Sequence, residues 1–214
     1  KGVIFSNQEV NNFELPKRKM SNWVIFKNKS LKEKNGFPEE VINNIEDDTL
    51  SIVKNLNLDT KDKEPTKGLV IGGVQSGKTT NMAALMAMAA DLGFNVFIVL
   101  SGMIESLRSQ TENRLRELIN NTSKDRTWEL VKEPKNFPNN YINNLYDPRK
   151  NLYMVVLKNS TRLVDLINWI QSNSNIASKL KVLVIDDEAD QASVNTSKYP
   201  LENRKTINRL IVNL

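Results

Sequence analysis

The segment Gly72-Gly73-Val74-Gln75-Ser76-Gly77-Lys78-Thr79 fills each fixed position of the phosphate-binding pattern G-x-x-x-x-G-K-[ST]. Glycine at positions 72 and 77 lets the backbone turn its N–H groups toward anionic oxygens. Lys78 supplies a positive charge for the outer phosphates of a nucleotide, and the Thr79 hydroxyl is the expected magnesium ligand. The residues predicted to bind ATP and Mg²⁺ are therefore Gly72, Gly73, Val74, Gln75, Ser76, Gly77, Lys78, Thr79 and Thr80.

A second group of reactive residues follows the apolar run at 182–185, where the sequence continues Asp186-Asp187-Glu188-Ala189-Asp190. Nucleotide hydrolysis needs a carboxylate on the magnesium side and a base near the attacking water. An apolar strand that ends in acids delivers both at the carboxyl edge of a sheet. We assign Asp187 to the metal and Glu188 to the base, with Lys78 as the second catalytic residue. Asp186 takes the metal-side role instead if the strand is one residue shorter.

Composition excludes several other chemistries. The chain has no cysteine and no histidine, which excludes disulfides, thiolate zinc sites, cysteine nucleophiles and Ser-His-Asp triads. Any metal must then be held by oxygen ligands, which indicates magnesium. The net charge of +5 suits a polyanionic partner, although scattered basic residues on a solvated face explain it equally well. No apolar run approaches the ~18 residues of a membrane span. We expect a cytoplasmic protein that makes no membrane contact.

The elements that must position these residues alternate between strands and helices. Apolar runs predict a buried strand at 68–71, directly before the phosphate loop, and further strands at 95–100, 152–157 and 182–185. Helices are expected at 80–92, ending at Gly93, at 103–121 and at 161–172. The helix at 103–121 should bury Ile104, Leu107, Leu115, Leu118 and Ile119. This alternation predicts an α/β fold, a RecA-like P-loop NTPase with a right-handed parallel sheet between helices.

The other segments carry weaker signals. Residues 1–66 are expected to form an N-terminal, mostly helical or irregular appendage and connector, with loops and short elements up to residue 34 and a helix after Pro38. Residues 67–214 form the nucleotide-binding lobe. The triplet Asp59-Thr60-Lys61 resembles a nuclease fragment, but no partner acid accompanies it. The stretch 122–150 is interrupted by proline and is expected to be irregular, and its aromatic residues either pack beneath a loop or stack on bases.

Polar residues near the strand at 95–100 are candidates for nucleic-acid contact. Ser101 ends that strand, and Arg108 and Gln110 follow in the next helix. In a nucleic-acid motor this corner would offer Ser101, Arg108 and Gln110 to a phosphate backbone. A solvated helix face explains Arg108 and Gln110 equally well.

Together these motifs resemble a known family. Residues 187–190 match the D-E-A-D box of superfamily-two helicases, and GGVQSGKTT, LSGMIESLRSQTENRL and VIDDEADQASVN are similar to the Z-one domain. That domain is a helicase-like ATPase of bacterial restriction and phage-defence proteins, and it is labelled an endonuclease family. The resemblance covers 23–214. It implies DNA as a partner, together with nuclease or other defence subunits. It places Gln75 and Ser76 in the phosphate loop, 101–110 in the first nucleic-acid motif and 158–160 in a later strand-end motif, and it matches Asp187 and Glu188 to the metal and water-activating acids.

The sequence also departs from the helicase pattern. No adenine-reading Gln motif precedes the phosphate loop, and no nuclease constellation is visible, so the endonuclease label gains no support from these residues. The coupling motif of Ser-Ala-Thr type that should follow Ser193 is absent, as is the second RecA-like lobe with its arginine. We therefore expect the first helicase lobe, truncated before that motif, to bind nucleotide and hydrolyse it slowly by itself.

Two alternatives to a DNA motor remain open. One is a regulatory P-loop NTPase switch, in which nucleotide binding controls assembly and the protein binds no nucleic acid. The other is an adaptor with a vestigial loop, which the intact Lys78, Thr79, Asp187 and Glu188 disfavour. Stimulation of ATP hydrolysis by DNA distinguishes the motor from the switch.

Overall fold

Helices and strands alternate along the chain, and the structure has the mixed α/β class predicted from the sequence. The computed structural model describes residues 2–5, 15, 21–58, 67–71, 77–120, 127–132, 147, 149–172, 180–189, 206 and 210. The chain divides into two compact units, one of Lys1–Phe94 with Leu115–Thr127 and one of Asn95–Arg114 with Trp128–Leu214. The predicted boundary between residues 66 and 67 stays a prediction.

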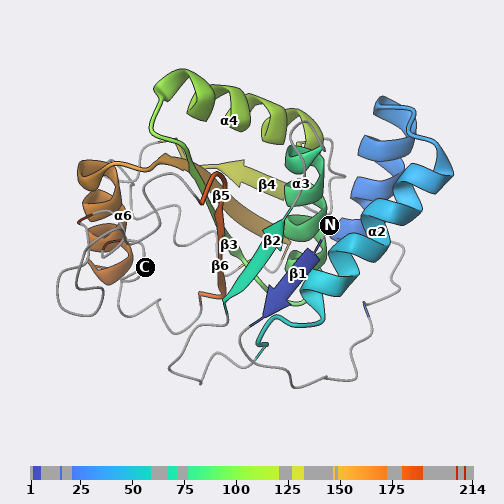
Figure 1. Ribbon diagram of the computed structural model, residues 1–214, viewed down its shortest axis with the longest axis horizontal. Coiled ribbons are helices and arrows are strands. Elements are labelled where there is room, and N and C mark those ends of the chain that lie inside the picture. The colour runs from blue at the N-terminus through green and yellow to red at the C-terminus, as the bar shows by residue number, and fades with distance from the viewer. Residues whose placement is uncertain are drawn as a thin grey trace. The chain divides into compact units, whose positions relative to one another are not determined.

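The second unit is built on a four-stranded sheet with the strand order β4-β5-β3-β6 (Figure 1). Its strands are β4 (Thr127–Leu130), β5 (Lys150–Leu157), β3 (Val96–Ser101) and β6 (Val182–Asp186). β3 lies between β5 and β6 and runs parallel to both. The strands predicted at 95–100, 152–157 and 182–185 are thus confirmed, and so is their parallel pairing. Their carboxyl ends meet at one edge of the sheet.

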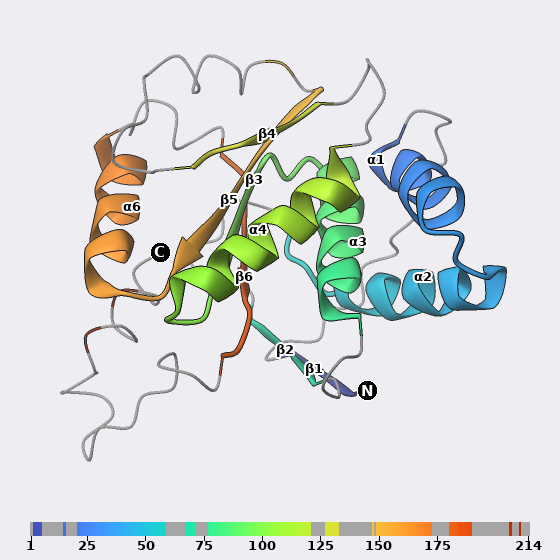
Figure 2. The same ribbon diagram turned by 90° about the horizontal axis from the view of Figure 1, so that it is seen from above.

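The core of this unit lies between the sheet and helix α6 (Ser160–Ser172), which runs beside the strands in Figure 2. All six residues of β3 are buried, as expected for a parallel strand covered on both faces. Leu163, Leu166 and Trp169 of α6 belong to the same hydrophobic cluster as the strand residues. The Asn159 side chain accepts a hydrogen bond from Arg162 N and so caps the start of α6. The predicted helix at 161–172 is confirmed.

The segment 122–150 is more ordered than predicted in its described part. Residues Thr127–Leu130 form β4, and Trp128 is buried on the sheet, with its ring centroid 5.1 Å from that of Phe97 and 6.4 Å from that of Tyr153. Offset and edge-on aromatic pairs of this kind stabilise a core. For Trp128 this supports packing, which was the first of the two roles considered for these aromatics.

The first unit contains helix α3 (Lys78–Asp91), which α1 (Asn22–Ile25) and α2 (Glu39–Val53) contact. The described residues 82–89 of α3 are all buried. α3 ends in a Schellman motif, in which Gly93 has φ +90° and Phe94 N donates to Ala89 O. The Asp91 carboxylate accepts hydrogen bonds from the backbone N–H groups of Asn22 and Trp23, and so caps α1. The helix predicted at 80–92 and its predicted end at Gly93 are confirmed.

Two expectations for the first unit were wrong. Residues 22–34 are helical, because α1 continues into a π-helical segment, η1 (Phe26–Lys34), whose Phe26 and Leu31 are buried. The strand before the phosphate loop, β2 (Gly68–Ile71), was expected to be buried, but Val70 is 51% exposed. β2 pairs antiparallel with β1 (Gly2–Phe5) in a separate two-stranded sheet, and a two-stranded ribbon cannot cover both of its faces.

Helix α4 (Glu105–Ile119) forms where predicted but exposes different residues. Leu115 and Ile119 are buried as expected, whereas Ile104 is 58% and Leu107 41% exposed. Arg108 and Glu112 continue the buried stripe toward the N-terminus at helical spacing, since they pair with each other and Arg108 also donates to the Val155 carbonyl. This ion pair turns Ile104 and Leu107 outward.

Candidate functional site

Gly77 is the one residue of the predicted loop Gly72–Gly77 that lies within the described residues. Gly77 lies in the left-handed region at φ +70° and forms the N-cap of α3. Its carbonyl accepts the first helical hydrogen bond, from Asn81 N at 3.1 Å. The predicted residues Gly72, Gly73, Val74, Gln75 and Ser76 lie outside the described residues. An L side chain at position 77 would be strained at this φ, which is the physical reason for glycine there.

Lys78, Thr79 and Thr80 occupy the first turn of α3. Lys78 is exposed, and Thr79 and Thr80 are half-buried. The first turn of a helix presents unpaired N–H groups and a partial positive charge, to which Lys78 adds a full charge. A phosphate is the natural ligand for such an arrangement.

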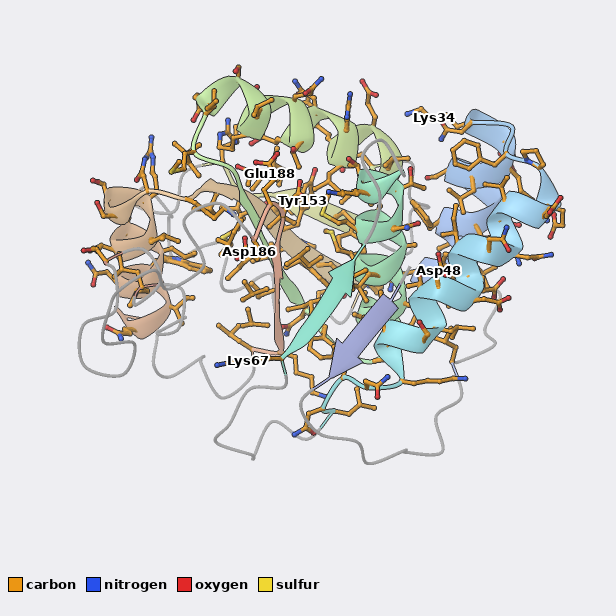
Figure 3. All side chains as sticks on the ribbon, viewed as in Figure 1. Lys34, Asp48, Lys67, Tyr153, Asp186 and Glu188 are labelled. Carbon is orange, nitrogen blue, oxygen red and sulfur yellow. The ribbon has the colours of Figure 1, made fainter. Side chains whose placement is uncertain are left out.

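The acidic turn, defined as residues 186–189, begins where β6 ends (Figure 3). Asp186 is the last strand residue, and Asp187 N donates to Leu100 O at 2.9 Å, which extends the ladder with β3 by one bond. Glu188 then adopts φ +58°, the only positive φ at a non-glycine position in the described chain. A left-handed glutamate is strained, and strain of this kind is concentrated at functional sites.

The Glu188 side chain is unusual as well. Its Oε2 atom is buried and has no hydrogen-bond partner among the described residues. A buried carboxylate oxygen without a donor costs free energy unless a ligand or water fills the gap. Strain and an unsatisfied acceptor thus coincide on the residue that the sequence assigns as the catalytic base.

Lys158 lies directly after β5 and anchors the acidic turn. Its side chain has 0% exposure. Its Nζ atom donates to Asp186 Oδ1 at 2.9 Å, to the Asp187 carbonyl at 2.8 Å and to the Glu188 carbonyl at 2.6 Å. These acceptors match the three N–H donors of an ammonium group. Lys158 had no individual role among the residues predicted from the sequence. A lysine directly after an apolar strand, on the same sheet edge as the acids, was the available signal.

The Lys158 contact bears on the open choice between Asp186 and Asp187. Asp186 belongs to β6, and its carboxylate is paired with the buried ammonium. Asp187 is the first residue beyond the strand. The strand therefore does not end one residue earlier, which was the condition for giving Asp186 the metal-side role, and Asp187 keeps that role as a prediction.

The donor chemistry suits magnesium without a preformed protein cage. Within the described ranges no group of three or more acidic residues could by itself hold a metal ion. Mg²⁺ is usually held by one or two carboxylates together with substrate phosphates and water. The Thr79 hydroxyl and the Asp187 carboxylate stay the predicted protein ligands of magnesium. Thr79 belongs to the first unit and Asp187 to the second.

The candidate nucleic-acid residues differ in their surroundings. Ser101 is buried, and its Oγ lies 3.4 Å from Val156 O, while Gln110 is exposed. Arg108 donates to Glu105 at 2.7 Å and to Glu112 at 2.6 Å. Burial opposes the charged form of Arg108, but the hydrogen bonds to Glu112 and Glu105 outweigh it and raise the pKa of Arg108. Arg108 therefore stays charged at every relevant pH.

A small cavity of about 60 Å³ opens beside the end of β5. Three cationic side chains line it, Arg108, Lys132 and Arg162, against one carboxylate, Glu105. The cavity is far smaller than the ~300 Å³ or more of typical small-molecule pockets, so it suits a single ionic group. Lys132 and Arg162 were not predicted from the sequence, because only the pairing of β5 with its neighbours brings them beside Arg108.

The described residues define a mixed α/β protein with a parallel sheet, a helix, α3, that begins at a left-handed glycine, and a strand, β6, that ends in acidic residues. Comparison with protein-family models, with curated proteins and with solved structures finds no match to this chain. The similarity to the Z-one family thus stays a prediction. Among the described helices none is long and apolar enough to cross a membrane.

Proposed function

We propose that the protein binds ATP and hydrolyses it with Mg²⁺ as the first motor lobe of a helicase-like DNA translocase. The observation that carries this proposal is the acidic turn, where Glu188 combines a left-handed backbone with a buried carboxylate oxygen that has no hydrogen-bond partner among the described residues. The left-handed Gly77 at the start of α3 supports phosphate binding at that helix start. The link to restriction and phage defence rests on the family resemblance alone.

In the proposed reaction each residue has a separate task. Lys78 and the N–H groups of the first α3 turn bind the outer phosphates of ATP. Thr79 and Asp187 would hold Mg²⁺, which neutralises phosphate charge when bound. Glu188 accepts a proton from water while the water oxygen attacks the γ-phosphorus. The bond from that phosphorus to the β–γ bridging oxygen breaks, and ADP leaves with the electron pair.

Steady-state ATP hydrolysis by the natural full-length protein tests this proposal, with Mg²⁺ and with or without single- and double-stranded DNA. A motor should show DNA-stimulated turnover that falls as salt rises, because phosphate contacts release counterions. A robust rate of ATP hydrolysis that DNA does not change would favour the regulatory NTPase switch. A complete lack of ATP binding would leave only the vestigial-loop adaptor.

The cationic cavity beside β5 is the feature that favours DNA over a nucleic-acid-free switch. Lys132 and Arg162 line it and have no ion-pair partner within the described part of the chain. Single phosphates of a nucleic-acid backbone fit a small, open, cationic pocket. Exposed Leu107 lies on the same turn of α4 as Glu105 and Arg108, and exposed Ile104 directly precedes that helix.

We expect Lys132→Gln and Arg162→Gln each to weaken DNA binding about three- to tenfold, and each to lower the slope of log affinity against log salt by about one. Fluorescence anisotropy with a labelled oligonucleotide measures both quantities. Arg114→Gln is the matched control, since Arg114 is an exposed cation on α4 that does not line the cavity. An equal loss in the Arg114 variant would show that diffuse charge, not the cavity, binds DNA.

A further inference from the structure

Lys158 is the most completely buried charged side chain of the described structure, and the proposed reaction gives it no task. Burying an ammonium group is expensive unless hydrogen bonds replace its water. Here an aspartate and two backbone carbonyls replace it, at 2.6 to 2.9 Å. An apolar residue of similar length would fill the space without that cost, which indicates a role for the charge.

The two carbonyls identify that role. They belong to Asp187 and Glu188, the two residues whose carboxylates the proposed reaction uses. Glu188 has a strained φ of +58°, which the chain adopts only if surrounding contacts enforce it. A buried ammonium that binds consecutive carbonyls is such a contact. Lys158 also directly follows a different strand, β5, and thus ties the turn to the sheet.

We infer that Lys158 is a positioning residue for the proposed hydrolysis: it holds the backbone of Asp187 and Glu188 in the reactive conformation and uses Asp186 as its structural counter-ion. This inference rests on the proposed function. It makes Asp186 a partner of Lys158 and leaves Asp187 for the metal. Lys158 acts through the turn and does not itself touch the nucleotide.

The test compares four variants in the full-length protein: Lys158→Met, Asp186→Asn, the double variant that carries both changes, and Asp187→Asn as the reference for loss of the metal ligand. We expect Lys158→Met to lower kcat roughly 50-fold, because displacing a catalytic group by about 1 Å can cost up to 100-fold. The KM for ATP should change by less than about threefold, because Lys158 does not itself touch the nucleotide in the ground state or in the transition state. Lys158→Met should also lower the melting temperature, because Asp186 loses its counter-ion.

The double variant separates positioning from stability. It removes both members of the ion pair, so the melting temperature should recover, whereas kcat should stay low because nothing holds the two carbonyls. Asp186→Asn keeps an oxygen acceptor for Lys158 and should lose less than about fivefold in kcat. Lys150→Met, at the opposite end of β5, is the matched control and should behave as the wild type.

Several results would overturn the inference. Recovery of kcat together with the melting temperature in the double variant would show that Lys158 only stabilises the fold. If Asp186→Asn lowers kcat as much as Asp187→Asn does, Asp186 is the metal ligand and the inference is wrong. This comparison tests the inference even if Lys158→Met does not fold. If the wild-type protein hydrolyses ATP and the Lys158→Met variant has the same kcat, this inference is overturned and the proposed function is not. A wild-type protein that binds ATP without hydrolysing it overturns the proposed function as well.

Discussion

Glu188→Gln is expected to lower ATP turnover about 1,000-fold while ATP binding is retained, because the change removes a general base and nothing else. Glutamine has the size of glutamate but cannot accept the proton of the attacking water. The contacts that hold the turn run from Lys158 to backbone carbonyls, and a change of side chain leaves them in place. The Glu188→Gln change therefore removes the ability to accept a proton at the buried Oε2 position and leaves the backbone of the turn as it is.

Single-turnover hydrolysis and equilibrium binding of a fluorescent ATP analogue measure the two effects separately. Glu40→Gln is the matched control, since Glu40 is an exposed glutamate in the first turn of α2. It should keep wild-type turnover. Unchanged turnover in the Glu188 variant would refute the catalytic assignment, and a parallel loss of ATP binding would show that Glu188 holds the ligand instead.

The sheet was predictable because its signals are local. β3, β5 and β6 are apolar runs, and an apolar run can be recognised as a strand without knowledge of its partner strands. The α3 helix was equally clear, because good helix formers lie between Gly77 and Gly93. The acidic strand end followed from the same reasoning, since an abrupt change from apolar to acidic residues marks a carboxyl edge.

The features that were missed depend on contacts distant in sequence. Helix α1 begins where Asp91, 68 residues away from Trp23, accepts its N-terminal N–H groups. The orientation of α4 is set by Arg108 and its bond to Val155 O, 47 residues away. Lys158 reaches carbonyls 29 and 30 residues further along the chain. Periodicity within one segment cannot reveal such polar contacts, because they depend on how strands pair.

Lys78→Ala is expected to weaken ATP binding about 300-fold and to abolish hydrolysis at ordinary ATP concentrations, since losing one member of a close charge pair costs about 2 to 5 kcal/mol. Lys78 is exposed in the first turn of α3, directly after the left-handed Gly77. Its removal deletes the charge while the helix start remains. Isothermal titration with ATP and Mg²⁺ measures the loss.

Lys67→Ala provides the comparison for this effect, because Lys67 is likewise exposed and in the same unit but precedes β2. If the phosphate loop binds ATP, the Lys67 variant should bind it about as tightly as the wild type does. Equal weakening in both variants would mean that general positive charge attracts the nucleotide. Tight ATP binding by the Lys78 variant would exclude the predicted loop as the phosphate site, and with it the role proposed for Lys78.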